Sequence, residues 1–225
     1  MVEGARGAQV SSREVIFENV RKALGRAAGL LPTTLAAPRL RIPISDRHRY
    51  STLFGQNFEK LGGKSFFVRE PGGVAPILSE LLQGKRAVAS NAHFLTACGI
   101  AGLPQVQSGF TDREALRAAC VAADVGITSA DYALAETGTL VMLASPDEPR
   151  LISLLPPMHI AVFPRSRMLA NLDELLAVLP NPAEQSSAMV LITGPSRTAD
   201  IEQILVRGVH GPGEIYAVIV EEGSE

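Results

Sequence analysis

The chain has 225 residues, 46% of them hydrophobic, which is long enough to bury a substantial core within one domain. Its 21 basic and 23 acidic residues give a formal net charge of -2, which excludes the global basic field that holds a nucleic-acid backbone. The longest apolar runs fall far short of the roughly 20 residues that span a bilayer, and no secretory signal is expected. We therefore expect a cytoplasmic protein with no membrane span and no nucleic-acid partner.

The N-terminal stretch predicts a helical arm followed by a linker. Ser11 and Glu14 have the spacing of a capping box, and the apolar residues that follow recur on one helical face, which predicts a helix from about Ser12 to Arg26. The segment 27–46 contains three prolines and no sustained period, which is typical of an extended linker. We therefore divide the chain into residues 1–46, the arm and linker, and residues 47–225, a compact α/β domain.

The compact domain is predicted to alternate strands with helices. Aromatic and aliphatic residues recur with helical spacing from Tyr50 to Leu61 and stop at Gly62-Gly63, where glycine readily ends a helix. Further helices are expected at Val74–Leu82, at Asp112–Ala122 after a Thr111/Glu114 capping box, and at Leu172–Leu179 after Asn171/Glu174. Seven apolar runs read as strands, several apolar on both faces: Ser65–Arg69, Arg86–Ser90, Val125–Ser129, Thr139–Ala144, Ile160–Phe163, Met189–Thr193 and Ile215–Val220. This alternation implies a layered domain with a mainly parallel sheet.

The cysteines and histidines indicate no metal site. Cys98 and Cys120 belong to no C-x-x-C spacing, and both are expected to be core thiols. A four-cysteine iron–sulfur cluster cannot be built from two cysteines, so any such cluster must lie on a partner. The histidines, His159 among them, show no ligand spacing, and His159 is taken as structural. No G-x-G-x-x-G loop follows a strand, so a nicotinamide or flavin site is unsupported.

The first segment that could carry chemistry is Glu136-Thr137-Gly138-Thr139, which lies between two apolar runs. A carboxylate beside two hydroxyls and a glycine could act as a general base, a nucleophile or a hydrogen-bond acceptor. The alternative is a turn in which Gly138 supplies a positive φ and Glu136 pairs with an arginine.

The second segment, from Gly194 to Glu202, follows an apolar strand and is expected to open a short helix. Backbone amides at that helix start, together with the side chains of Ser196, Arg197 and Thr198, would suit a phosphate or carboxylate, and Asp200 completes the candidate site. The structural alternative is a helix cap, with Arg197 paired internally. The segment is not a Walker A loop, because the Gly-Lys pair is absent.

The third segment places His210 between glycines just before the last apolar strand. A histidine there could transfer a proton or bind a carboxylate, because its pKa is ordinarily near neutrality. The competing interpretation is a Gly-Pro turn with a partly exposed histidine.

Four ordered motifs resemble the LUD domain of the lactate-utilisation protein C family over most of the chain from about Ser12 onward. They are Ala135-Glu136-Thr137-Gly138-Thr139-Leu140-Val141, Pro157-Met158-His159-Ile160, Gly194-Pro195-Ser196-Arg197-Thr198-Ala199-Asp200-Ile201-Glu202 and Gly208-Val209-His210-Gly211-Pro212. The resemblance implies a three-layer α/β/α fold of the NagB/RpiA/CoA-transferase-like group. It also implies participation in oxidising L-lactate to pyruvate with two other subunits that carry iron–sulfur segments. In addition, Glu136 and Gly138 resemble the glutamate-x-glycine segment of CoA transferases, whose asparagine is replaced by Thr137.

Three hypotheses of function follow. In the first, the domain works in a lactate-oxidising assembly and binds a small anionic ligand, with Arg197 and the Gly194–Thr198 amides holding the charge while Glu136 and His210 act on the ligand. In the second, it is a stand-alone sugar-phosphate isomerase or CoA-ester enzyme with Glu136 as base or nucleophile. In the third, it is a non-catalytic scaffold whose helical arm clamps the partner subunits through its apolar face.

Overall fold

The computed structural model describes residues 11–25, 48–199 and 205–221. The chain divides into two units, residues 1–37 and 38–225, and each is described by itself. In the first unit, α1 (Ser12–Leu24) begins with the predicted capping box, in which the Ser11 hydroxyl and the Glu14 carboxylate each accept from the other residue's backbone N–H. The helix ends at Gly25 in the left-handed region, and its apolar side chains are exposed. The predicted linker, residues 27–46, lies wholly outside the described residues.

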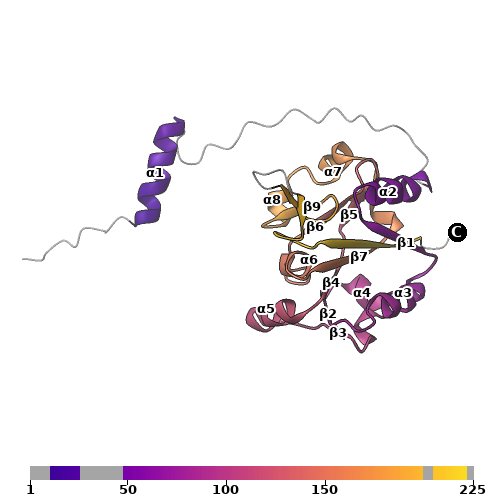
Figure 1. The fold of residues 1–225 in the computed structure, drawn as a ribbon. Helices are drawn as coiled ribbons and strands as arrows, with labels where there is room; N and C mark the ends of the chain where they lie inside the picture. The colour runs from indigo at the N-terminus through magenta and orange to yellow at the C-terminus, as the bar shows by residue number, and fades with distance from the viewer. Residues whose placement is uncertain (1–10, 26–47, 200–204, 222–225) are drawn as a thin grey trace, which may run out of the picture. The chain divides into compact units, whose positions relative to one another are not determined.

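Six parallel strands form the central sheet of the second unit, in the order β1-β12-β7-β4-β2-β3 (Figure 1). Five of them correspond to predicted strands, and the short β3 was not predicted. The mainly parallel sheet expected from the sequence is thereby confirmed. The strands are β1 (Lys64–Val68), β2 (Ala87–Ala89), β3 (Val106–Gln107), β4 (Val125–Ser129), β7 (Met158–Pro164) and β12 (Glu214–Val220).

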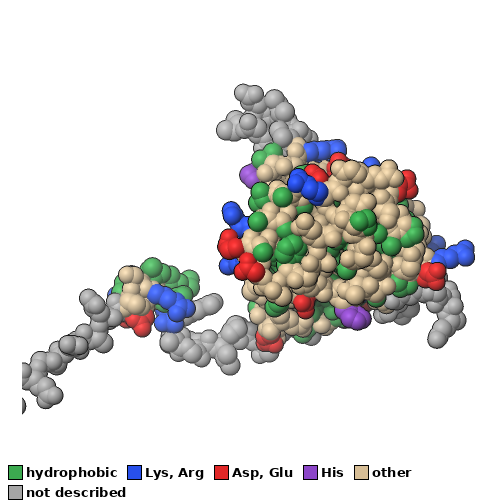
Figure 2. Space-filling view, turned by 90° about the horizontal axis from the view of Figure 1, so that it is seen from below, with side chains coloured by type: hydrophobic (Ala, Val, Ile, Leu, Met, Phe, Trp, Pro, Cys, Tyr) green, Lys and Arg blue, Asp and Glu red, His purple; other side chains and the backbone are tan. Residues whose placement is uncertain are grey.

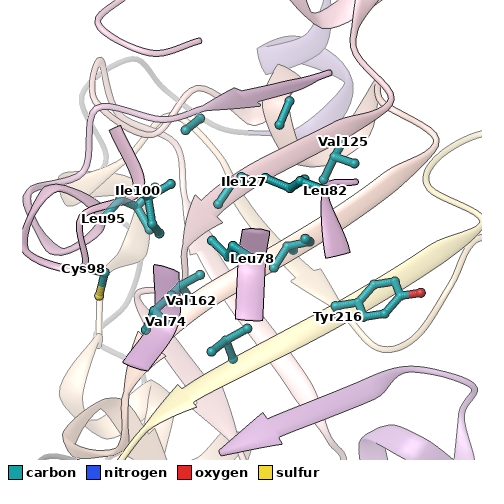
Figure 3. Close-up of a cluster of buried hydrophobic side chains, with 14 of the residues drawn as sticks. Val74, Leu78, Leu82, Leu95, Cys98, Ile100, Val125, Ile127, Val162 and Tyr216 are labelled. Carbon is teal, nitrogen blue, oxygen red and sulfur yellow. The ribbon is translucent and has the colours of Figure 1, made fainter. Parts of the chain in front are cut away.

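Both faces of this sheet are covered, which explains why its strands are apolar on both sides. On one face, α3 (Val74–Leu81) and α4 (His93–Ala97) pack over alternate residues of β4, β7 and β12, with Leu78 and Ile127 fully buried (Figure 3). On the other face lie α2 (His48–Lys60), α5 (Arg113–Ala122), α6 (Arg150–Leu154) and a second sheet. The fold is therefore the layered α/β arrangement that the sequence predicts.

The second sheet is the main departure from the predicted topology. Its order is β8-β5-β6-β9, built from β5 (Tyr132–Leu134), β6 (Thr139–Leu143), β8 (Met168–Leu169) and β9 (Met189–Ile192). The runs that form β6 and β9 were correctly predicted as strands, but they pair antiparallel and lie outside the parallel sheet. Only residues 135–138 join β5 to β6, which is too short for the dozen or more residues that a parallel crossover needs. The far face of this sheet is covered by α7 (Leu172–Val178).

The remaining elements are short. A two-stranded sheet pairs β10 (Arg197–Ala199) with β11 (Leu205–Arg207), and α8 (Pro182–Gln185) precedes β9. Three single 3₁₀ turns lie at Pro71–Gly73, Ile100–Gly102 and Arg165–Arg167.

The helix caps confirm one sequence prediction and correct another. Asn171 caps α7 as predicted, because its Oδ1 accepts from the Glu174 N–H at 3.1 Å. The cap of α5 is Asp112 rather than Thr111: Asp112 Oδ2 accepts from the Ala115 N–H at 2.7 Å. The predicted Thr111/Glu114 capping box is therefore not formed, and the helix begins one residue later than that box requires.

Both cysteines are core thiols, as predicted. Cys98 packs in the cluster beneath α3 and α4, and Cys120 packs between α5 and the sheet. Burial raises the pKa of each thiol to about 11, which keeps both protonated at neutral pH and makes them poor nucleophiles.

The surface of the compact unit carries no continuous basic field on the face that Figure 2 shows, where basic side chains lie in separate groups beside acidic ones. Within the described residues, no helix is long and apolar enough to cross a membrane.

His159 is completely buried on β7, as expected of a structural histidine. Its Nε2 lies 2.8 Å from the Thr128 hydroxyl on the neighbouring strand β4, and burial lowers the pKa of the imidazole to about 4. The unfolded chain therefore takes up a proton near pH 6.5 that the folded chain takes up only near pH 4.

We expect this histidine to destabilise the fold as the pH falls from about 6.5 to 4, by up to about 3 kcal/mol. The measurement is the urea unfolding free energy of the wild type minus that of His159→Gln at pH 7 and pH 4. The wild type should lose more unfolding free energy than His159→Gln between pH 7 and pH 4. If the free-energy difference between the two proteins is the same at pH 7 and at pH 4, the folded protein protonates this ring as readily as the unfolded chain does.

Candidate functional site

The carboxyl ends of β2 and β4 form the topological switch point of the parallel sheet. After β2 the chain passes to α4 on one face, whereas after β4 it passes to the second sheet on the opposite face. Ligands of open α/β sheets bind outside the strand ends where the connections part in this way. A cavity of about 270 Å³ lies here, and Ser90 and Asn91 at the end of β2 contribute to its lining.

Five polar side chains gather around this switch point, and we name them the carboxyl-edge cluster. They come from the ends of three neighbouring strands and from the loop between β6 and α6: Ser90, Ser129, Asp131, Glu148 and Arg167. Because parallel strands all end at the same edge, residues far apart in the sequence meet there.

Glu148 is the most strongly perturbed acid in the cluster. Burial raises the pKa of its carboxyl to about 8, although the Ser129 N–H, which donates to Oε1 at 2.7 Å, and the nearby Ser90 hydroxyl both act to lower it. The Ser90 hydroxyl faces this carboxyl without reaching hydrogen-bond geometry. Among the described residues, Ser90 Oγ and Glu148 Oε2 therefore have no hydrogen-bond partner, although both are buried. At neutral pH Glu148 holds a proton and can act as a donor.

Arg167 supplies the positive charge of the cluster. Its Nη1 donates to Ser129 Oγ at 2.9 Å and to the Ala130 carbonyl at 2.7 Å, and its guanidinium lies 5.9 Å from the centre of the Phe94 ring. These contacts orient the guanidinium beside the end of β4. A fixed guanidinium of this kind suits recognition of a carboxylate or phosphate.

Asp131 faces Arg167 from the start of β5. Its Oδ2 accepts from the Leu143 N–H at 2.6 Å. Desolvation raises the pKa of the Asp131 carboxyl, while the Leu143 N–H and the positive charge of Arg167 act in the opposite direction. The cluster therefore combines one guanidinium with two acids whose affinity for protons is increased by burial.

Asn91 builds the wall of the cavity. Its side-chain amide donates to the Phe110 carbonyl at 2.9 Å and its Oδ1 accepts from the Gly109 N–H at 2.8 Å. The Asn91 N–H donates to the Asp147 carbonyl at 2.9 Å, which fixes the loop that carries Glu148. One residue thus joins the end of β2 to both neighbouring loops.

The predicted segment from Glu136 to Thr139 lies against α2 instead. Asn57 on α2 donates to the carbonyls of Ala135 and Glu136 at 3.0 and 2.9 Å, and the Glu136 side chain is exposed. Gly138 has a φ of 61°, and a Cβ there would lie 2.4 Å from the backbone nitrogen of Phe58. The positive φ proposed for Gly138 is therefore confirmed, and its role is close packing.

Hydroxyl groups link this segment to the Gly194 loop. Thr137 Oγ1 lies 2.7 Å from Thr139 Oγ1, which lies 2.8 Å from Thr193 Oγ1. Gly194, with a φ of 97°, packs against Leu61 just after α2. The structure therefore places the first two predicted segments together, around the C-terminal half of α2.

The expected helix does not open within residues 194–199, the part of this segment that the structure describes. Arg197 and Thr198 belong to strand β10, whose backbone groups pair with β11, so the amides of a helix start are replaced by a strand pair. The exposed Arg197 donates through Nη2 to the Leu61 carbonyl, and the Ser196 N–H donates to the Pro212 carbonyl at 2.9 Å. Asp200 lies outside the described residues.

The loop carrying His210 also packs beside Ser196, and the His210 side chain is exposed. Pro212 lies two residues before β12 begins, and Leu61 lies three residues before β1 begins. The group formed by Ser196, Arg197 and His210 therefore lies at the amino edge of the parallel sheet, opposite the carboxyl-edge cluster.

The sequence offered only a weak signal for the carboxyl-edge cluster. Ser90 and Ser129 each close an apolar strand, and this position at a strand end is the pattern that could have singled them out. Glu148 lies in a polar turn, Ser145-Pro146-Asp147-Glu148-Pro149, which reads as an exposed loop, and Arg167 follows β7 without a motif.

Comparisons with known proteins agree with the fold. The family model described as the LUD domain matches residues 53–220. A lactate utilization protein C from Exiguobacterium sp. is 36% identical over 155 residues, which are 65% of this chain and 66% of that protein. One from Bacillus subtilis is 42% identical over 104 residues, 44% of this chain and 43% of that protein. The matches thus span less than two thirds of these relatives.

A solved structure shares the fold. The crystal structure of a DUF162 family protein from Deinococcus radiodurans superposes with a TM-score of 0.59 at 22% identity, covering 79% of this chain and 99% of that chain.

Proposed function

Because this chain belongs to the LUD domain family, we propose that it works in bacterial lactate utilisation, as a ligand-binding component of a multi-subunit system that oxidises L-lactate to pyruvate. The name of its relatives supports the lactate system. The iron–sulfur clusters of that system are proposed to lie on two partner subunits, because this chain has two cysteines and both are buried core thiols.

The observation that carries this proposal is the pair of unpartnered buried atoms, Ser90 Oγ and Glu148 Oε2, next to Arg167 at the switch point. A buried polar atom without a partner costs about 1–3 kcal/mol, a cost that a bound ligand would remove. We assign the ligand carboxylate to Arg167 and the C2 oxygen of lactate or pyruvate to Ser90 and protonated Glu148.

The binding test is calorimetric titration of the full chain with pyruvate and with L-lactate. Arg167→Gln should weaken binding about tenfold to a hundredfold, because a charged hydrogen bond to the ligand is lost. The control is Arg69→Gln, which removes an exposed arginine just after β1 and should leave the affinity unchanged. Equal affinities for the wild type and Arg167→Gln would contradict the carboxyl-edge assignment.

The assembly test is a lactate-to-pyruvate assay with an artificial electron acceptor, using this chain alone, the two partners, and all three together. Turnover only with all three supports the assembly role. Turnover of a sugar phosphate or CoA ester by this chain alone would favour the stand-alone enzyme. Full lactate turnover by the two partners without this chain would mean that this chain is an accessory protein. If deleting residues 1–46 abolishes complex formation, that result would favour the non-catalytic scaffold.

A second location for the anion is the group around the C-terminal half of α2, where Glu136, Thr137, Gly138, Thr139, Gly194, Ser196, Arg197, Thr198 and Asp200 were proposed from sequence, with His210 nearby. The linked hydroxyls of Thr137, Thr139 and Thr193 favour it. Arg197→Gln in the same titration separates the two locations. If Arg197→Gln loses affinity and Arg167→Gln does not, the ligand binds at the amino edge of the sheet.

A further inference from the structure

A groove of about 640 Å³ lies between α5 and α6. These two helices lie on the side of the parallel sheet opposite α3 (Figure 1). It is distinct from the 270 Å³ cavity at the end of β2, and its walls come from different residues. Its volume falls within the range of about 300–1,000 Å³ that is common for small-molecule sites.

Three arginines line this groove. Arg113 and Arg117 are four residues apart and so lie on one face of α5, and Arg150 begins α6 on the other side. All three side chains are exposed, and no hydrogen bond or ion pair engages them within the described part of the chain. Like charges at this helical spacing destabilise a helix slightly, so an anion between them would be favourable.

The acidic groups near the groove offset only part of this charge. Asp112 is the only acid among the described residues that line it, and its carboxylate caps α5 through the Ala115 N–H. Glu148 lies in the adjoining loop, but it turns inward to Ser129 and burial raises its pKa to about 8. The exposed Asp147 lies in that loop, and the exposed Glu114 lies on α5 between Arg113 and Arg117 in the sequence, with no ion pair to either among the described residues.

Apolar side chains also line the groove. They include Phe110, which is half-buried, Leu116, which is buried, and Leu154, whose side chain is 39% exposed. A lining that combines an aromatic ring with exposed guanidinium groups suits a ligand that has an apolar body and several negative charges.

We propose that this groove binds a nucleotide-like ligand, a di- or triphosphate attached to an aromatic body. The arginines of α5 and α6 hold the phosphates, and the aromatic body packs on Phe110 and Leu154. This site is independent of the lactate proposal. Asn91 lies between the two sites, because its side-chain amide donates to the Phe110 carbonyl and its backbone N–H donates to the Asp147 carbonyl.

The test is calorimetric titration of the full chain with ATP, pyrophosphate and adenosine. We expect ATP to bind more tightly than pyrophosphate, and pyrophosphate more tightly than adenosine. Arg117→Gln and Arg150→Gln should each weaken ATP binding about tenfold, as expected for the loss of a charged hydrogen bond. Arg69→Gln serves as the matched control for a change in net charge, and unchanged thermal unfolding shows that the variants fold.

Three results would overturn the proposal: no binding of ATP or pyrophosphate, equal weakening by Arg69→Gln, or binding of an acidic peptide such as polyglutamate in place of ATP. Titration of Arg117→Gln with pyruvate shows whether the nucleotide proposal fails separately from the proposed lactate site. Pyruvate affinity should be unchanged in this variant whichever way the ATP experiment comes out.

Discussion

Replacing Gly138 with alanine should lower the free energy of unfolding by about 4 kcal/mol. The residue has a φ of 61°, where a side chain costs about 1–3 kcal/mol, and the new Cβ would meet the Phe58 backbone nitrogen at 2.4 Å, an overlap that adds about 1–3 kcal/mol. Neither the β5–β6 turn nor the backbone of α2 can yield easily, because Asn57 ties them together through two carbonyls. Urea unfolding measures the loss.

The control for this variant is Gly84→Ala. Gly84 has a φ of 69°, yet a Cβ added there would meet no neighbouring atom within 4 Å, so the change should cost only about 1–2 kcal/mol. The difference between the two variants isolates the contact with α2. Equal losses would mean that α2 moves away at little cost, and that Gly138 serves the turn alone.

Replacing Glu148 with glutamine should stabilise the fold at alkaline pH. The carboxyl of Glu148 has a pKa of about 8 in the folded chain, against an ordinary value of 4.5. Between these two pH values the folded chain therefore keeps a proton on this carboxyl that the unfolded chain has released. The contribution of this carboxyl to the free energy of unfolding is complete below pH 4.5, and it is lost as the pH rises to about 8. The loss amounts to roughly 3–5 kcal/mol, which glutamine, as an uncharged analogue of the protonated acid, does not incur.

The measurement is the unfolding free energy of both proteins between pH 5 and pH 9. The advantage of Glu148→Gln should grow up to about pH 8 and then level off. Glu114→Gln is the control, because Glu114 is exposed on α5 and its replacement should change stability by no more than about 0.5 kcal/mol. Parallel profiles for the wild type and Glu148→Gln would show that this carboxyl ionises normally in the folded protein.

Local patterns explain the parts of the fold that the sequence predicted well. The spacing of Tyr50, Phe54 and Phe58 predicts α2 because all three must face the core, where they are buried. The apolar runs of β4, β7 and β12 predict strands covered on both sides, and both faces are covered. The capping box at Ser11 also depends only on near neighbours, and it is formed.

The carboxyl-edge cluster could not be predicted in the same way, because its members meet only through strand pairing. Ser90 and Ser129 come together because β2 and β4 are neighbours in the sheet, although β3 and α5 lie between them in the chain. Glu148 has the sequence context of an exposed turn, and its raised pKa arises from burial that tertiary packing produces. The helix predicted after Gly194 was wrong for a related reason. Residues Arg197–Ala199 pair with β11, and no local pattern identifies that partner strand.

The sequence by itself thus determined the layered α/β class, five of the six strands of the parallel sheet and the burial of Cys98 and Cys120, because these follow from local periodicity and composition, while its four ordered motifs indicated the family by resemblance. Only the tertiary structure decided to which edge of the sheet each loop belongs. It separated Arg197 and His210 at the amino edge from Arg167 and Glu148 at the carboxyl edge. The physical reason is that strand order and direction, which are set by long-range packing, determine which loops share an edge.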